Sequence, residues 1–576
     1  MKKKNFLQLL FRNIHIPGAH ALHRGLASLS FLEKGLVLFL FLLLTGSTLS
    51  MMFQASSAIG VAKPVPGGTL IEGIVGTPRY INPVLALSEA DRDLSQLIYS
   101  GLMKAKPDGT LVPDLAQEYT VSDNGVTYTF ILRDTYFHDG ERVTADDVLY
   151  TIDQIQNPVI QSPQFRRWEG VVAEKIDDKT VQFTLIKPYA GFLENTTIGI
   201  LPSHLWNTTS SENISSFTAN IQAIGSGPFM IKRIDRGSDG IPHAFVLRPF
   251  NKYALGEPYI RELTFSFFDT QNELLNAFKN KTVDSIHSVD PDTLTSIQKN
   301  SYTLVSADLP RVFGVYFNQN QAAIFTEKNV RIALSVTAPR EDIIDTVLKG
   351  HATALTTPIP ANLYAGSDII PDPKKEPGRA RELLEEAGFK KNGETGIYES
   401  KEGPLAFTIT TADTPELESV AILLKAAWEE LGAQVTIATL DIAKLQNDVI
   451  EQRKYDALLF GQVVGREGDL YPFWHSSGRN APGLNISLYA NKKVDDIVET
   501  IRTTLDAEIR KDLYASFVEE IQKDTPAVFL YAPKLLYVLP SSIRGVDLGI
   551  VESPSERFLN THTWYVTTKK FWEIFN

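Results

Sequence analysis

The chain has 576 residues, of which 43% are apolar and 22% are charged, so it can bury a large core and form several domains. Its formal net charge of −12 argues against nucleic acid as a partner. It contains no cysteine, which excludes disulfides, thiolate metal sites and cysteine nucleophiles.

The first predicted element is an apolar run without a charge from Gly35 to Phe53. As a helix it would reach about 28 Å, close to the hydrocarbon thickness of a membrane. Basic residues dominate the segment before it, so we expect 1–34 to be cytoplasmic and the bulk of the chain to lie outside. Cleavage as a signal peptide is the alternative, because Ala55 to Ala58 offers small residues, although the region before the apolar run is long for one.

The folded body is predicted to begin after a linker at 54–67, which is rich in proline and glycine near its end. Thr69 to Val75 is predicted as its first strand. An irregular loop follows, in which Pro78 and Pro83 lie on either side of Tyr80.

The next elements are a hairpin and a capped helix. Apolar and polar residues alternate from Val126 to Arg133, and Asp123-Asn124-Gly125 supplies a tight turn before them. Thr144 can cap a helix whose third residue is Asp147 and which ends before Pro158. A second ribbon is predicted from Val171 to Leu185, so this part of the chain is a small α+β domain.

From Leu263 onward, strands alternate with helices, which predicts crossover units on a sheet. The clearest helix begins at Pro415 and is stopped by Gly432, between strands predicted at Leu405 to Thr411 and Val435 to Leu440. Two such halves, joined near Arg311 to Asn318 and again near Pro526 to Ala532, predict two lobes with a double hinge.

The amino-acid sequence of several segments resembles that of family 5 of the bacterial extracellular solute-binding proteins, the oligopeptide- and dipeptide-binding subunits of ABC importers. The resemblance extends over roughly Gly68 to Tyr531. The segments that carry it are Leu97-Ile98-Tyr99-Ser100-Gly101-Leu102, Pro113-Asp114-Leu115-Ala116, Val121 to Phe130, Phe137-His138-Asp139-Gly140, Thr144 to Val148, Gly225-Ser226-Gly227-Pro228-Phe229 and Asn329 to Leu334.

The resemblance implies an α/β, two-lobed periplasmic-binding-protein-like fold of the large three-domain, type II form. It also implies a peptide ligand, ABC permease partners in the membrane, a monomer, no cofactor and no catalytic residues. The predicted organisation is a cytoplasmic basic segment at 1–34, a transmembrane anchor or signal sequence at 35–53, a linker at 54–67, lobe I at 68–101 with 222–311 and 530–576, a small second domain at 102–221, and lobe II at 312–529.

The best candidate for a ligand site is the loop from Gly461 to Trp474, because ligands of crossover sheets bind beyond the carboxyl ends of strands. Its glycines let the backbone approach a ligand closely, and its aromatic residues offer apolar walls. The resemblance implies that Asp469 pairs with the α-ammonium of a peptide. The alternative is that Asp469 caps the next turn and that Trp474 is a core residue. The predicted substrate-binding residues are Asp469, Trp474, Phe473, Tyr80 and Arg466.

The sequence motifs give little support for nucleotide binding, metal binding or catalysis. The sequence has no G-x-x-x-x-G-K loop and no H-E-x-x-H pair, which argues against nucleotide or zinc catalysis. Isolated histidines such as His204 and His475 are more often structural than metal ligands. The alternatives to a peptide receptor are a binding protein for a nickel chelate, with His475 as the residue to test, or for a sugar, and an envelope-anchored hydrolase.

Overall fold

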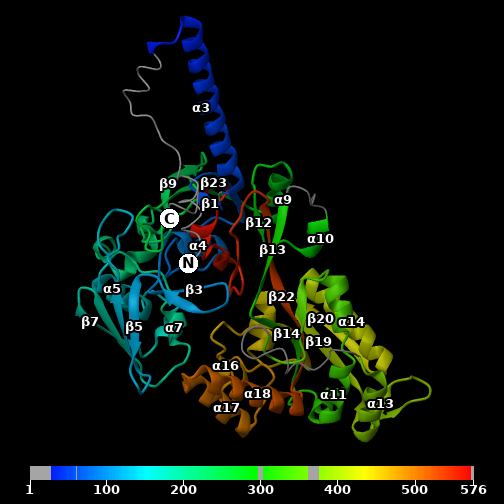
Figure 1. The fold of residues 1–576 in the computed structure, drawn as a ribbon. Helices are drawn as coiled ribbons and strands as arrows, with labels where there is room; N and C mark the ends of the chain where they lie inside the picture. The colour runs from blue at the N-terminus through cyan, green and yellow to red at the C-terminus, as the bar shows by residue number, and fades with distance from the viewer. Residues whose placement is uncertain (1–26, 60, 296–301, 361–374, 572–576) are drawn as a thin grey trace, which may run out of the picture. The chain divides into compact units, whose positions relative to one another are not determined.

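The computed structural model describes residues 27–59, 61–295, 302–360 and 375–571 (Figure 1). These residues divide into two compact units. One contains the described residues up to Val65 together with those from Thr567, and the other is Pro66–Val566.

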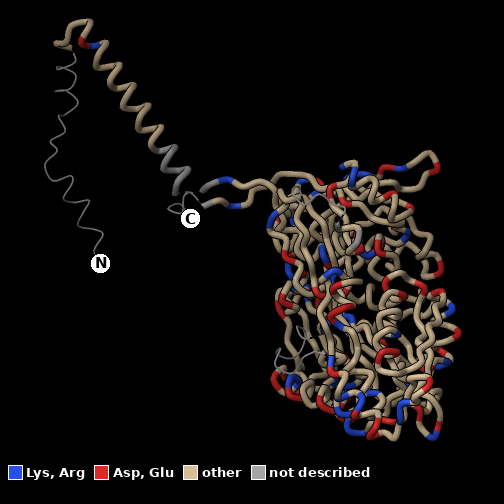
Figure 2. The backbone as a smooth tube through the Cα atoms, turned by 90° about the vertical axis from the view of Figure 1, so that its right-hand side faces the viewer, with Lys and Arg blue, Asp and Glu red and all other residues tan. Residues whose placement is uncertain are grey.

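The first unit is a long helix with a two-stranded ribbon. Helix α3 spans Phe31–Ile59, and its part from Phe31 to Met51 is long and apolar enough to cross a membrane, a test that a signal sequence also passes. Figure 2 shows how few charged residues this helix carries. Strand β1 (Val61–Val65) pairs antiparallel with β23 (Thr567–Phe571). The predicted linker at 54–67 is therefore wrong in part: it contains the end of α3 and a strand whose valines suit pairing.

The larger unit begins with a sheet in the order β2-β11-β10-β9. Strands β2 and β11 are parallel, and the other neighbours are antiparallel. The predicted strand at Thr69 to Val75 is confirmed. The bounds are β2 Thr69–Val75, β9 Phe229–Arg236, β10 Pro242–Pro249 and β11 Glu262–Phe268, with helices α4 Glu89–Ile98 and α9 Gln271–Lys279 and the short pair β3 Met103–Ala105 and β4 Leu111–Pro113.

The small α+β region contains the predicted hairpin and helix. A four-stranded antiparallel sheet has the order β5-β6-β8-β7, and Tyr119 of β5 pairs with Phe130 of β6. Helix α5 (Ala145–Gln156) begins with a capping box between Thr144 and Asp147, as predicted. The remaining bounds are β5 Ala116–Val121, β6 Thr127–Leu132, β7 Val172–Asp177, β8 Thr180–Thr184, α6 Phe165–Trp168, α7 Phe192–Asn195 and α8 Ser203–Trp206.

The second large sheet contains the predicted crossover units. Strands β19 (Ala406–Ala412), β20 (Gln434–Leu440) and β21 (Ala457–Val463) are parallel, and α14 (Pro415–Leu431) connects the first two. Gly432 ends α14 in the left-handed conformation with φ of 111°, as the position of a glycine after the helix predicts.

Further helices surround this sheet in Figure 1. Their bounds are α11 Lys328–Val336, α12 Arg340–Asp342, α13 Pro377–Glu386, α15 Ile442–Lys444, α16 Tyr471–Trp474, α17 Lys492–Thr503 and α18 Ala507–Asp524. A small sheet is formed by β16 Lys390–Lys391, β17 Tyr398–Ser400 and β18 Gly403–Pro404. The short helix α10 spans Pro291–Thr295.

Strand β22 (Ala527–Pro540) pairs with different strands of this sheet along its first and its last residues. Its first residues pair with β14 (Arg311–Phe317) and β15 (Ala352–Ala354), and its last residues pair with β12 (Ile286–His287) and β13 (Tyr302–Asp308). The predicted border between 529 and 530 thus falls inside a strand. The predicted crossover units before residue 306 are present: β11 and Ser285, just before β12, both pair parallel with β2, and β12 and β13 both run antiparallel to β22, so the three strands are parallel to one another.

Two large hydrophobic cores lie on either side of this shared strand. One extends from Val312 to Ala532 and defines lobe II. The other combines residues between Leu70 and Leu309 with residues between Leu535 and Trp564, and we call it lobe I. The small α+β region shares the second core. Two cores joined through β14 and β22 confirm the predicted two-lobed α/β fold with a double hinge.

Candidate ligand-binding site

The loop that follows β21 turns twice before α16 begins. Gly465 and Gly468 have φ values of 72° and 71°, in the left-handed region that favours glycine. A Cβ on Gly465 would lie 2.5 Å from a carboxylate oxygen of Glu467, so a side chain there would have to displace that carboxylate. These two turns fix the side chains of Arg466 and Glu467 against residues that are distant in sequence.

Arg466 binds two carboxylates of lobe I. The side chain is 5% exposed, and its Nη1 donates to Oε1 of Glu194 in α7 at 2.6 Å. Its Nη2 donates to Glu556, which lies in the 3₁₀ helix Pro554–Phe558, and its backbone N–H donates to Glu552 at 2.6 Å. A loop that leaves the lobe II sheet is therefore held to lobe I by charge-assisted hydrogen bonds.

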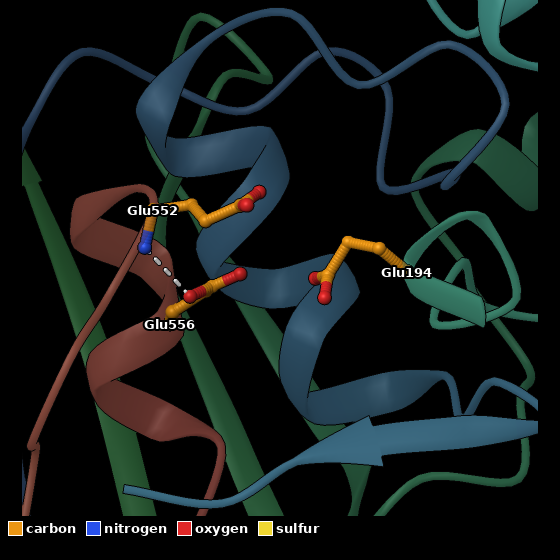
Figure 3. Close-up of side chains that lie close together, drawn as sticks. All are labelled: Glu194, Glu552 and Glu556. Atoms are coloured by element: carbon orange, nitrogen blue, oxygen red, sulfur yellow. Dashed lines mark hydrogen bonds between the residues drawn. The ribbon is translucent and has the colours of Figure 1, made fainter. Parts of the chain in front are cut away.

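Glu194, Glu552 and Glu556 point toward one another (Figure 3). Their carboxylate oxygens lie within 4.8 Å of each other, and the backbone N–H of Glu552 donates to Glu556 at 2.8 Å. Oxygen ligands at this spacing could suit a divalent cation. The guanidinium of Arg466 already binds two of the three, so we assign no metal to this group.

A fourth carboxylate, Glu467, makes the cluster strongly acidic. Burial and the charge of Glu552 raise the pKa of Glu467 to about 8, although Arg167 opposes the shift. Burial raises the pKa of Glu556 to about 7, and that of Glu194 lies well above its ordinary value. Near neutral pH this cluster therefore holds protons that isolated glutamates would have lost.

A polar cavity of about 180 Å³ adjoins this cluster. Its walls come from one face of α4, from the strand β3, from the small α+β region and from the C-terminal segment, and Arg466 is the only lining residue among those described in lobe II. The charged and polar residues among those that line it are Arg92, Ser95, Gln96, Tyr99, Ser100, Lys104, Asp114, Gln164, Arg167, Glu194, Asn195, Thr197, Tyr253, Arg466, Ser553, Ser555 and Glu556.

A second charged pair lies in the cavity wall. Lys104 is 6% exposed and donates from Nζ to the hydroxyl of Tyr253 at 2.8 Å. Burial lowers the pKa of Lys104 and raises that of the neighbouring Asp114, while the attraction between the two charges opposes both shifts. Lys104 and Asp114 therefore compensate each other electrostatically inside lobe I.

Asp469 lies just beyond Glu467 and has partners within lobe II. Its Oδ1 accepts from the backbone N–H of Tyr471 at 3.2 Å, and its Oδ2 lies 3.1 Å from Nη2 of Arg502. Burial raises the pKa of Asp469, and the charge of Arg502 opposes this. The structure thus shows Asp469 one residue before Leu470, the N-cap of α16, with its carboxylate accepting from the first N–H of that helix. Its role toward a ligand ammonium stays a prediction.

Arg502 connects α17 of lobe II with the small α+β region. Its guanidinium carbon lies 4.8 Å from the ring centre of Tyr471 and 5.3 Å from that of Tyr189. The backbone N–H of Ala190 donates to the carbonyl of Arg502 at 2.8 Å. This contact joins the lobes at a second place besides Arg466.

The other predicted residues lie away from the cavity. Trp474 is fully buried in the lobe II core, where its ring packs edge to face against Phe517 at 6.0 Å, and Phe473 packs partly buried against the same core. Tyr80 packs against the lobe I core and donates its backbone N–H to Asp91 at 2.8 Å. Trp474 therefore has the packing of a core residue, and its predicted role as a ligand wall gains no support here.

Sequence reasoning missed most of the cavity wall. Arg92, Ser95 and Gln96 recur at helical spacing on one face of α4, and this polar stripe is the available signal. Asp114 lies in one of the segments that carry the family resemblance, yet nothing in its spacing marks it as a wall residue. Glu194 and Glu556 belong to helices too short to show periodicity.

Two lobes joined by shared strands, with a polar cavity bounded by residues of both, define a binding protein for small solutes. The profile described as bacterial extracellular solute-binding proteins, family 5 middle, matches residues 110–482. The chain belongs to this family.

Several relatives match nearly the whole chain. The oligopeptide-binding protein AppA of Bacillus subtilis is 26% identical over 557 residues, covering 94% of this chain and 99% of the relative. The dipeptide-binding protein of Escherichia coli is 25% identical, covering 85% and 94%. Among solved structures, the ABC transporter substrate-binding protein CtaP of Listeria monocytogenes superposes with a TM-score of 0.74 at 26% identity, covering 87% of this chain and 99% of that one. The family and the fold predicted from the sequence are thereby confirmed.

Proposed function

We propose that this protein is the extracytoplasmic peptide receptor of an ABC importer and that it delivers its ligand to a permease in the membrane. The observation that carries the proposal is the match to the oligopeptide-binding protein AppA along nearly the full length of both chains. The long apolar helix α3 supports attachment to the outer face of the membrane, with 1–34 in the cytoplasm. We propose that the receptor works as a monomer and without catalysis.

The polar cavity and the loop after β21 are the part of the molecule where we place ligand contacts. Arg466 lines the cavity from lobe II, while Glu194 and Glu556 bind it from lobe I. A ligand that touches these residues contacts both lobes at once. Such a ligand can bias an equilibrium between open and closed forms, because its contacts differ between the two.

His475 is the residue to test for the alternative ligand, a nickel chelate. Its Nδ1 lies 2.7 Å from the hydroxyl of Ser477, and its Nε2 lies 3.3 Å from Glu499. Both ring nitrogens are therefore engaged with side chains of its own lobe, so neither is free to coordinate a metal ion.

The test is calorimetry on the full chain in lipid nanodiscs with a small panel of peptides between two and nine residues long. We expect saturable binding of at least one length class. Mass spectrometry of solutes released from the purified protein provides the independent check. Release of sugars or metal chelates together with no heat from any peptide would contradict the proposed function.

A further inference from the structure

The polar cavity of lobe I contains hydrogen-bonding atoms that no other described residue satisfies. They are Oγ of Ser95, Oγ of Ser100, Oδ1 of Asp114 and Nε of Arg466. All four residues are more than nine-tenths buried, and all four line the same cavity. Ser100 and Tyr253 lie close enough to Asp114 to lower its pKa, but neither meets Oδ1 with hydrogen-bond geometry.

Buried polar atoms in folded proteins are nearly always paired, so four unpaired ones around a single cavity indicate an occupant. The volume of about 180 Å³ is far larger than the roughly 10–15 Å³ that one water needs. The cavity thus has room for a side chain of a bound ligand.

The charges of the wall are already compensated within the protein. Lys104 lies beside Asp114, and Arg466 binds Glu194 and Glu556. Of the other two charged lining residues, Arg167 lies 3.9 Å from Glu552 and Arg92 is exposed to solvent. A charged guest would therefore add an unpaired buried charge, which is costly. An apolar guest would leave the four polar atoms without partners, which is costly as well.

The unused hydrogen-bonding capacity is mixed. Nε–H of Arg466 can only donate, Oδ1 of Asp114 is a carboxyl oxygen that can accept, and the hydroxyls of Ser95 and Ser100 can do either. A carboxamide carries both a carbonyl acceptor and an NH₂ donor, so it can satisfy both kinds of partner while remaining neutral.

We propose that this cavity is a specificity pocket for a neutral carboxamide side chain, glutamine or asparagine, of the bound peptide. This inference rests on the proposed function as a peptide receptor. It deepens that function by naming the chemistry of one ligand residue and the four atoms that recognise it.

The test compares tripeptides of alanine in which one position carries glutamine, glutamate or methionine, three side chains of similar length. Each position is varied in turn, and binding to the full chain in nanodiscs is measured by calorimetry. At one position we expect the glutamine peptide to bind at least about 10-fold more tightly than the glutamate and methionine peptides. Only the amide can pair with the hydrogen-bonding atoms of the cavity wall without adding a charge.

Ser95→Ala should weaken binding of that glutamine peptide by about 3- to 10-fold, the range of one neutral hydrogen bond, and leave the methionine peptide unchanged. Ser100→Ala is the second variant, in case the first folds poorly. Ser226→Ala is the matched control, since its hydroxyl is also buried and unpaired but does not line the cavity, and it should change neither affinity.

Equal affinities for the three side chains at every position would show that the cavity holds only water and would overturn the inference, with peptide binding itself intact. An equal loss for all peptides in Ser95→Ala would overturn it as well. Absence of binding by any tripeptide of the series, with longer peptides still bound, would also count against the pocket. Failure of every peptide would instead overturn the proposed function.

Discussion

Arg466, in the loop after β21, and Glu194, in the small α+β region, meet at 2.6 Å with both side chains at most 7% exposed. Removing one member of such a buried pair leaves the other charge without compensation, which costs about 3 to 5 kcal/mol. We therefore expect Arg466→Met to lower the free energy of unfolding by about that amount in urea titrations.

Arg479→Met is the control for this experiment. It lies on the surface of the same lobe, so we expect its effect to stay within about 0.5 kcal/mol. Equal losses in the two variants would show that the pair between Arg466 and Glu194 contributes little net stability.

The glutamate cluster predicts that stability depends on pH. The pKa of Glu467 is raised to about 8 and that of Glu556 to about 7, whereas unfolded glutamates titrate near 4.5. Between these values the folded state binds more protons than the unfolded state, so stability falls as the pH rises from about 5 to about 8. Glu467→Gln should flatten this decline in thermal unfolding scans at successive pH values. A decline of the same steepness in Glu467→Gln would assign the pH dependence to other groups.

Asp469 offers a test of the ligand ammonium. If a peptide ammonium displaces Arg502 from this carboxylate, Asp469→Ala should weaken binding of a free-amine peptide by roughly 30-fold or more. Acetylation of the peptide should weaken binding to the parent protein by a similar factor and have little effect on the variant. Calorimetry on the four combinations decides the matter. Additive losses would leave Asp469 with only its observed role at the start of α16.

Arg502 predicts how the lobes respond to a ligand. Its guanidinium, 5.3 Å from the ring centre of Tyr189, holds α17 of lobe II against the small α+β region. Arg502→Ala should shift the ligand-free protein toward open forms and raise its radius of gyration in X-ray scattering, while a saturating peptide should lower it again. Identical scattering curves for parent and variant, with and without peptide, would indicate a rigid body.

The apolar helix predicts membrane attachment. The full chain should fractionate with membranes, whereas a variant without Met1 to Ser57 should be soluble and bind peptides as before, because β1 begins only at Val61. Sequencing of the mature N-terminus in native cells checks the same point, and a start near Ala58 would identify the helix as a cleaved signal.

Local signals predicted the local structure well. The turn before Val126, the cap at Thr144 and the helix between Pro415 and Gly432 depend on neighbours a few residues away, and the structure contains each of them. Pairing across long distances could not be predicted in this way. Nothing near β13 in the sequence specifies that it runs antiparallel to β22, and alternating strands and helices fit several topologies equally well.

The predictions for the site divide in the same way between local sequence signals and long-range contacts. Arg466 could be proposed because it lies in a glycine-rich loop after a strand, and the structure places it on the cavity. The partner of Asp469 could not be predicted, because Arg502 lies in another helix and only tertiary packing brings the two charges together. The aromatic ring of Trp474 suggests a ligand wall, but an aromatic ring suits a core equally well, and here Phe517 packs against it.

The pairing of β1 with β23 has a consequence for biosynthesis. Val61 emerges from the ribosome soon after α3, but its partner Phe571 emerges only after all of Pro66–Val566 has been made. The ribbon of β1 and β23 therefore cannot form before synthesis is nearly complete, and a chain interrupted during translation keeps an unpaired β1. Proteases preferentially cut such unpaired segments near a chain end, so the ribbon distinguishes finished chains from truncated ones.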